Sequence, residues 1–439
     1  MSLGSGVNKK MTKQSDVLDL TQPNAHYIKN VGNLAITHEV VACEDVLDEH
    51  GIKLVAKGAH IDPVLHERLL RFKLSKPLEV SLSVSDGLTP AKLVAEVETL
   101  LEKIPPLATL LKPASVRSEV MSTIRGMQMG RISTMLASMA CASQEGATHN
   151  HLALAVVISL GIGAQLGMDP VQLQNITMAA LLHDVGELYI NPEYRLRGRV
   201  LTPEEWKHIT AHPRIGQMVI EETMSLPKSI SIAIAEHHER SDGFGYPRLL
   251  GAKDISAMGN ILLVTEALCG VFSKDSNVRE RACLAVKVVP GEYPKEIVSL
   301  FSTLMKQDDN LEFISQNAAC ADDVISRAKQ IAQILSDTLV RIDQQVKLVG
   351  GAAKLQDRIL ERVLMLRRTM HATGISDYMN LGTLSSNDLG CLALEVETIV
   401  FEIEWRLRDL AREVALAMGE FPDDQRRSFE LVVASLSSN

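Results

Sequence analysis

Several features are scarce in this chain, and each absence narrows the kind of protein it can be. Aromatic residues make up only 4% of the sequence while hydrophobic residues make up 46%, so aliphatic side chains carry most of the apolar content. That balance favours helices packed on helices over extended sheets. No apolar run reaches the ~20 residues that a membrane-spanning helix needs, and the first twenty residues lack the apolar centre of a signal peptide. We therefore expect a mainly α-helical, cytoplasmic protein without a membrane span.

Paired cysteines and excess positive charge are also missing. The six cysteines are scattered and form no C-x-x-C pair, which argues against a disulfide framework or a thiolate zinc site. The formal net charge of −9 argues against nucleic acid as a partner, because nucleic-acid surfaces are bound by basic patches. A small anionic ligand is still compatible with this charge, since a bound cation can reverse the local field.

The length of 439 residues predicts two to four domains, at roughly 100–200 residues per domain. Residues 1–25 are polar, and we expect a flexible N-terminus. Residues 26–105 predict a small α+β regulatory module. Its predicted strands are 40–46, 52–56 and 77–84, the first two forming a hairpin, and its predicted helices are 62–72 and 90–103.

Helical periodicity dominates the remainder of the chain. Prolines at positions 105, 106 and 113 predict a linker, after which residues 115–320 form a helical domain. Its first predicted helices cover 116–142, 151–166 and 172–182. Residues 321–439 contain long amphipathic segments, for which a C-terminal helical bundle and a homodimerisation region are the two interpretations.

The placement of histidines carries the chemical signal. Seven of the thirteen histidines lie between His149 and His238. Within that span an apolar helix ends in His183-Asp184, and Gly186 follows shortly after. This pair supplies one imidazole and one carboxylate able to bridge two cations. A cation is the natural partner of such an aspartate, because burying it unpaired would be costly.

A second histidine element follows a predicted helix start. Residues 202–206 form a capping box with proline at the first helical position. That helix carries His212, and Pro213 is expected to begin a new helix. His208 lies one turn earlier on the same face, so spacing alone does not exclude it as a ligand.

A third element is a pair of adjacent histidines, His237 and His238, at the end of an apolar helical stretch. Adjacent residues point ~100° apart on a regular helix. Both imidazoles therefore reach one cluster only if the helix ends there or if the cluster holds more than one metal. The turn-rich loop 241–247 follows, and its glycines allow a close approach to a ligand.

Taken in order, four motifs resemble the HD-GYP family, a branch of the HD phosphohydrolases that hydrolyses cyclic-di-GMP. They are His183-Asp184, His212-Pro213, His237-His238-Glu239 and Gly245-Tyr246-Pro247. The resemblance runs from near residue 125 to near residue 320 and implies an all-helical HD-type metal phosphohydrolase bundle. It also implies a bacterial signalling protein with two divalent metal ions (Fe, Mn or Zn), cyclic-di-GMP as ligand, and a diguanylate cyclase-type or other signalling protein as partner.

The resemblance assigns roles to individual residues. The implied metal ligands are His151, His183, Asp184, His212, His237, His238 and Glu266. Asp184 would bridge the two metals, and His149 is the alternative to His151. The implied catalytic residues are His183, Asp184 and Glu187, and the implied substrate-binding residues are Gly243, Gly245, Tyr246 and Pro247.

Three departures from the family pattern bear on activity. Glu187 stands where the family usually has a lysine, Glu266 stands where it has an aspartate, and its arginine-bearing stretch is not recognisable in 273–281. Reversing the charge at 187 opposes an anionic substrate by several kcal/mol at an effective dielectric of ~20, unless Glu187 becomes a further metal ligand. The hypotheses are therefore an active cyclic-di-GMP phosphodiesterase, a catalytically weak or inactive module that senses cyclic-di-GMP or metal or binds a protein, and an HD hydrolase of another phosphoester.

Overall fold

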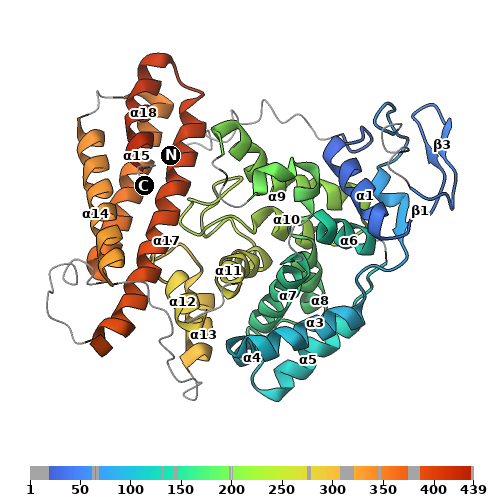
Figure 1. Ribbon diagram of the computed structural model, residues 1–439, viewed down its shortest axis with the longest axis horizontal. Coiled ribbons are helices and arrows are strands. Elements are labelled where there is room, and N and C mark those ends of the chain that lie inside the picture. Colours follow the sequence, from blue (N-terminus) through green and yellow to red (C-terminus); the bar gives the residue numbers. More distant parts are fainter. Residues whose placement is uncertain are drawn as a thin grey trace, which may run out of the picture.

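The computed structural model is mainly helical (Figure 1). It describes residues 19–436 except for 62–64, 66–68, 131, 143–146, 197–198, 200, 274–277, 307–320, 345–347 and 374–385. Most of the predicted flexible N-terminus and most of the predicted helix 62–72 therefore lie outside the described residues. Leu20, within the stretch predicted to be flexible, is buried. None of the described helices combines the length and the apolar character needed to cross a membrane.

The described residues of the N-terminal module up to Val84 form one helix, one 3-10 turn and four short strands. They are α1 (Ala25–Thr37), β1 (Val40–Ala42), β2 (Val46–Leu47), β3 (Lys53–Val55), η1 (Leu78–Val80) and β4 (Leu82–Val84). β2 pairs with β3 in an antiparallel hairpin, as predicted, whereas β1 pairs with β4.

Two strand predictions in this module are wrong in detail. The predicted strand 40–46 is two strands in two sheets, because the chain turns at Asp45, whose carboxylate accepts a hydrogen bond from the backbone N–H of Lys57 at 2.7 Å. The first half of the predicted strand 77–84 is the 3-10 turn η1, which begins after Pro77. Both errors arise where a local turn interrupts a run of residues with strand propensity.

The next four helices replace both the predicted linker and the predicted long helix 116–142. They are α3 (Pro90–Lys103), α4 (Pro105–Leu110), α5 (Ala114–Arg125) and α6 (Ile132–Ala142). The helix capped by Thr89 is as predicted. The linker is wrong because Pro105 and Pro106 occupy the first turn of α4, where a missing N–H costs nothing. The long helix is wrong because α5 ends at Gly126 and Gly130 has a positive φ of 29°.

The central helices surround the histidine-rich segment. They are α7 (Ala147–Gln165), α8 (Pro170–Leu182), η2 (Val185–Tyr189), η3 (Pro192–Arg195), α9 (Pro203–Thr223), α10 (Lys228–Glu236), α11 (Ala257–Phe272), α12 (Val278–Ala285) and α13 (Lys295–Lys306). The capping box at Thr202 and Glu205 is present. Pro213 does not begin a new helix, since it lies inside the continuous α9.

The C-terminal helices stand together on one side of the molecule (Figure 1). They are α14 (Ala321–Asp343), α15 (Gly350–Ala372), α17 (Ser386–Met418) and α18 (Asp423–Leu436). They share one hydrophobic cluster, whereas a separate cluster runs from Leu20 to Met305, so the N-terminal module and the central helices share a core.

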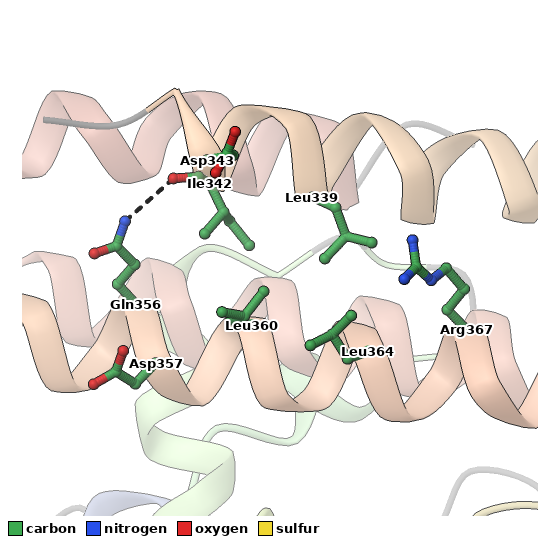
Figure 2. Close-up of a pocket in the computed structure, with 8 residues that line it drawn as sticks. All are labelled: Leu339, Ile342, Asp343, Gln356, Asp357, Leu360, Leu364 and Arg367. Atoms are coloured by element: carbon green, nitrogen blue, oxygen red, sulfur yellow. Dashed lines mark hydrogen bonds between the residues drawn. The ribbon is translucent and has the colours of Figure 1, made fainter.

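A cavity of about 580 Å³ lies between α14 and α15 (Figure 2). Its lining mixes Leu339, Leu360 and Leu364 with Asp343 and Arg367. No predicted site residue lines this cavity, which is therefore separate from the histidine-rich centre.

Candidate metal centre

The predicted metal ligands come from five helical elements whose ends or faces meet at one place. His151 lies on α7, His183 caps the end of α8, and His212 lies within α9. His237 and His238 follow the end of α10, as two adjacent ligands require, and Glu266 lies on α11. Asp184 follows His183 directly. The structure brings all seven together, in two groups of potential metal-binding side chains.

One group consists of His151, His183 and Glu266. The two Nε2 atoms of His151 and His183 are 3.0 Å apart. Glu266 Oε2 lies 3.6 Å from His183 Nε2 and 3.9 Å from His151 Nε2. This oxygen is buried and has no hydrogen-bond partner among the described residues, which leaves it free to bind a cation.

The other group consists of Asp184, His212, His237 and His238. The Nε2 atoms of His212 and His237 are 3.1 Å apart. The rings of His237 and His238 lie close together, with centroids 4.2 Å apart. Three imidazoles and a carboxylate thus meet at a second place.

Asp184 stands between the two groups and presents a different oxygen to each. Its Oδ2 lies 3.0 Å from His183 Nε2 and 3.3 Å from His151 Nε2. Its Oδ1 lies 3.5 Å from the Nε2 atoms of both His212 and His237. This placement is the geometry that a bridging carboxylate needs.

The ring orientations of three histidines are set by the backbone. The Nδ1–H groups of His183, His212 and His237 donate to the carbonyls three residues earlier, at 2.8, 2.7 and 2.6 Å. The Nε2 atoms then carry lone pairs that face inward. At 3.1 Å two unprotonated Nε2 atoms of His212 and His237 would repel each other, and either a proton shared between them or a bound metal ion relieves this repulsion.

Pro213 explains why His212 can make this bond within a helix. A residue at position 213 would normally donate its N–H to the carbonyl of Ile209, four residues earlier. Proline has no N–H, so that carbonyl remains available and accepts the Nδ1–H of His212 instead. Proline after His212 therefore provides the acceptor that orients the His212 ring inside a continuous helix.

Electrostatics in the centre favour a charged cluster. Burial alone would raise the pKa of Asp184, but His183 and the other histidines hold that pKa well below its usual range. Burial likewise opposes protonation of His183, yet Asp184 and Glu266 raise the pKa of this imidazole. Imidazole and carboxylate donors in such an arrangement fit a divalent metal ion.

Gly186 permits the close approach of η2 to α9. A Cβ atom there would lie 2.0 Å from the His212 carbonyl oxygen and 2.8 Å from the Gly216 nitrogen. Any side chain at 186 would therefore push Asp184 and His212 apart.

Glu187 does not join either metal-binding group of the described residues. Its carboxylate forms an ion pair with Arg195. Burial, with the charge of Asp184 next, raises the pKa of Glu187. The family pattern did not point to Arg195, because this residue lies at the end of η3, after the motif.

Two alternative histidines have different outcomes. His208 is exposed, its ring lies 5.8 Å from that of Tyr194, and it belongs to neither group. His149 lies on α7, but its side chain is outside the described residues.

The predicted substrate loop borders the second group. The ring of Tyr246 stacks on that of His238, with centroids 4.6 Å apart and an interplanar angle of 22°. Gly245 lies against the backbone of Glu239 and Arg240, where a Cβ would clash at 2.3–2.4 Å. The loop is thus packed tightly against the end of the motif that supplies His237 and His238.

The C-terminal helices contact the loop 241–247, and the sequence did not predict this contact. Arg362 on α15 donates to Asp242 at 2.5 Å, and Arg358 donates to the Gly243 carbonyl at 3.3 Å. Both guanidinium groups lie over the Phe244 ring, at 4.8 and 4.9 Å. These contacts join residues more than a hundred positions apart, so no local pattern could have revealed them.

Part of the chain is similar to known proteins. Residues 134–283 match the model described as HD domain. The chain is 32% identical over 166 residues to a cyclic di-GMP phosphodiesterase of Thermotoga maritima, covering 36% of this chain and 45% of the relative. It is 26% identical over 155 residues to the cyclic di-GMP phosphodiesterase PdeB of Borreliella burgdorferi, covering 34% of this chain and 41% of the relative.

A third relative is the cyclic di-GMP phosphodiesterase response regulator RpfG of Xanthomonas campestris, 33% identical over 113 residues, with 26% of this chain and 30% of the relative covered. The chain thus spans less than half the length of each of these relatives. A solved HDG"Y"P protein from Bdellovibrio bacteriovorus gives a TM-score of 0.33 at 15% identity, over 62% of this chain and 95% of that one. Residues 134–283 thus match an HD domain, and the same region is similar in sequence to cyclic di-GMP phosphodiesterases.

Proposed function

We propose that this chain hydrolyses cyclic-di-GMP at its histidine–carboxylate centre with two divalent metal ions. The observation that carries the proposal is the position of Asp184, whose two oxygens face two separate groups of ligands. The names of the relatives, which are those of cyclic di-GMP phosphodiesterases, support the choice of substrate.

Each metal would have its own set of ligands. His151, His183 and Glu266 would hold one ion, and His212, His237 and His238 would hold the other, with Asp184 shared. Imidazole and carboxylate ligands suit iron, manganese or zinc. When bound, such ions supply Lewis acidity, which polarises phosphoryl oxygens and lowers the pKa of water.

The chain's own residues would prepare this chemistry. The backbone carbonyls that accept from the Nδ1 atoms of His183, His212 and His237 hold the imidazoles in one orientation. Tyr246 and the glycines of its loop would offer the surface against which the nucleotide lies.

The ion pair between Glu187 and Arg195 bears on whether the domain is active. Glu187 replaces the family's lysine, which is the reason to consider a weak or inactive sensor. Because Arg195 neutralises the Glu187 carboxylate, an anionic substrate would meet much less repulsion than a free glutamate would cause. Activity is therefore the better supported of the two hypotheses.

A signalling-protein partner and a homodimer through the C-terminal helices stay predictions.

The proposal is tested by metal analysis of the full chain together with turnover of cyclic-di-GMP in added iron or manganese. We expect two metal equivalents per chain and hydrolysis of the phosphodiester bond. Asp184→Asn should lower metal content and reduce turnover by at least about a hundredfold, because it removes the shared charge.

His208→Gln is the matched control, because His208 is an exposed imidazole outside both groups. Its metal content and turnover should equal those of the unmodified chain. Metal-replete protein that leaves cyclic-di-GMP intact would contradict the proposed activity and favour the sensor.

A further inference from the structure

Arg412 is an arginine of the C-terminal helix α17 with an unusual environment. It is half-buried, and its guanidinium lies over the Trp206 ring at 4.6 Å. Among the described residues it forms no ion pair or hydrogen bond. By contrast, Arg358 and Arg406, on α15 and on α17 itself, are each paired with a glutamate.

The rings beneath Arg412 lead to the candidate metal centre. Trp206, in the first turn of α9, meets the Tyr246 ring edge-on at 6.0 Å. Tyr246 in turn stacks on His238, at 4.6 Å. Arg412 therefore stands at the outer end of a row of three rings whose inner end is a predicted metal ligand. Trp206 is only half-buried, so this row borders solvent.

The charge of Arg412 is incompletely compensated. Burial lowers the pKa of its guanidinium, Asp409 acts in the opposite direction, and Arg408 lowers it further. The Asp409 carboxylate is already bound to Arg240, at 2.8 Å. Arg412 thus keeps donors for which the described protein provides no acceptor.

We propose that Arg412 is a substrate-binding residue that this chain adds to the HD domain from its C-terminal helices. An arginine lying face-on to an aromatic ring keeps its N–H groups available at the edge of the guanidinium. That edge binds two neighbouring acceptors at once, and a cyclic guanine dinucleotide offers two such pairs: the oxygens of a phosphate, and O6 with N7 of guanine. This inference rests on the proposed cyclic-di-GMP activity.

The test compares Arg412→Gln with Arg408→Gln in the full, metal-loaded chain. Arg408 is the matched control because it lies one turn earlier on the same helix. Calorimetric titration with a non-hydrolysable phosphorothioate analogue of cyclic-di-GMP should give a dissociation constant about ten- to a hundredfold higher for Arg412→Gln. The KM for cyclic-di-GMP itself should rise in parallel while kcat, metal content and melting temperature stay near their original values. Arg412→Lys should recover part of the affinity if the partner is a phosphate.

Cyclic-di-AMP separates the two possible partners. If Arg412 holds a phosphate, Arg412→Gln should weaken cyclic-di-GMP and cyclic-di-AMP equally. If it reads guanine, the loss should be confined to cyclic-di-GMP. Either result supports the proposal.

Equal affinities in the Arg412 and Arg408 variants, or a change in melting temperature alone, would overturn it. Absence of both binding and hydrolysis in the unmodified chain is a different result, because it would refute the proposed function itself. The two failures are therefore distinguishable.

Discussion

At the scale of single residues, the centre depends on which backbone carbonyls are available to the imidazoles. Pro213 interrupts the hydrogen-bond ladder of α9 at the one place where His212 needs an acceptor. A proline inside a helix normally costs stability. In α9 the same proline leaves the Ile209 carbonyl available, and this carbonyl holds the His212 imidazole in a fixed orientation.

Pro213→Ala should therefore separate stability from metal binding. The alanine N–H would compete with His212 for the Ile209 carbonyl, so the affinity of the centre for its metal should fall about tenfold. The metal-free protein should gain roughly 1–3 kcal/mol in free energy of unfolding, because the helix regains a hydrogen bond and loses the clash of the proline ring. Metal titration and denaturant unfolding measure the two effects.

Pro203→Ala is the control for that experiment, since Pro203 occupies the first position of α9, where the missing N–H has no helical partner. Its metal affinity should be unchanged. An unaltered metal affinity in Pro213→Ala would show that the Ile209 carbonyl does not orient His212.

At the scale of elements, the N-terminal module holds the segment that follows the His-Asp pair. Asn30 on α1 donates to the Leu188 carbonyl at 3.1 Å, and Tyr27 stacks on Tyr189 with centroids 5.2 Å apart. The Tyr189 hydroxyl donates to Glu79, at η1. The short η2, which directly follows Asp184, is thus packed between the module and α9.

Glu79 makes this contact sensitive to pH. Burial raises the pKa of its carboxyl to about 7, against the pull of Tyr189. The Glu79 carboxyl loses its proton near pH 4.5 in the unfolded chain but only near pH 7 in the folded chain. The folded state therefore loses stability relative to the unfolded state as pH rises from about 4.5 to about 7. The loss amounts to roughly 3 kcal/mol.

Glu79→Gln should remove that loss, because the amide oxygen still accepts from Tyr189 and never ionises. At pH 8 we expect the variant to be more stable by up to about 3 kcal/mol, with little difference at pH 5. Denaturant unfolding at the two pH values measures this, and Glu98→Gln, at an exposed position on α3, is the control. A difference of equal size at both pH values would refute the role of ionisation.

At the scale of the whole molecule, a buried ion cluster joins the two hydrophobic clusters. Glu292 is fully buried between the central and C-terminal helices. It accepts from Arg362 at 3.0 Å and from Arg406 at 2.7 Å, and Arg240 lies 3.6 Å away. Burial opposes its charge, yet Arg406 and the other arginines lower the pKa of Glu292 to about 2.

Glu292→Gln should destabilise the chain by about 3–5 kcal/mol, because it leaves buried arginine charges without compensation. In the unmodified chain this contribution is complete above about pH 4.5 and is lost as pH falls towards 2. Thermal and denaturant unfolding would measure the change. The control is Asp423→Asn, which removes an exposed ion pair with Arg426 and should alter stability by less than about 0.5 kcal/mol. A similarly small change in Glu292→Gln would show that the cluster does not hold the two parts together.

The sequence alone determined those features that local chemistry specifies. Residues close together in the chain determine the mainly helical class, the capping box at Thr202 and the β2–β3 hairpin. The order of four short motifs carries the resemblance to the HD-GYP family. Five of the seven candidate ligands lie in the four short motifs, and the resemblance to the family pointed to the other two, His151 and Glu266.

Only the tertiary structure decided what depends on distant partners. It placed the Asp184 oxygens towards two different groups, and it brought Arg362 and Arg412 of the C-terminal helices to the predicted substrate loop and its border. Ion pairs and ring contacts of this kind join residues up to about two hundred positions apart and leave no periodic trace in the sequence. Propensity and spacing describe a segment by itself, whereas a site assembled from separate segments exists only once they are packed together.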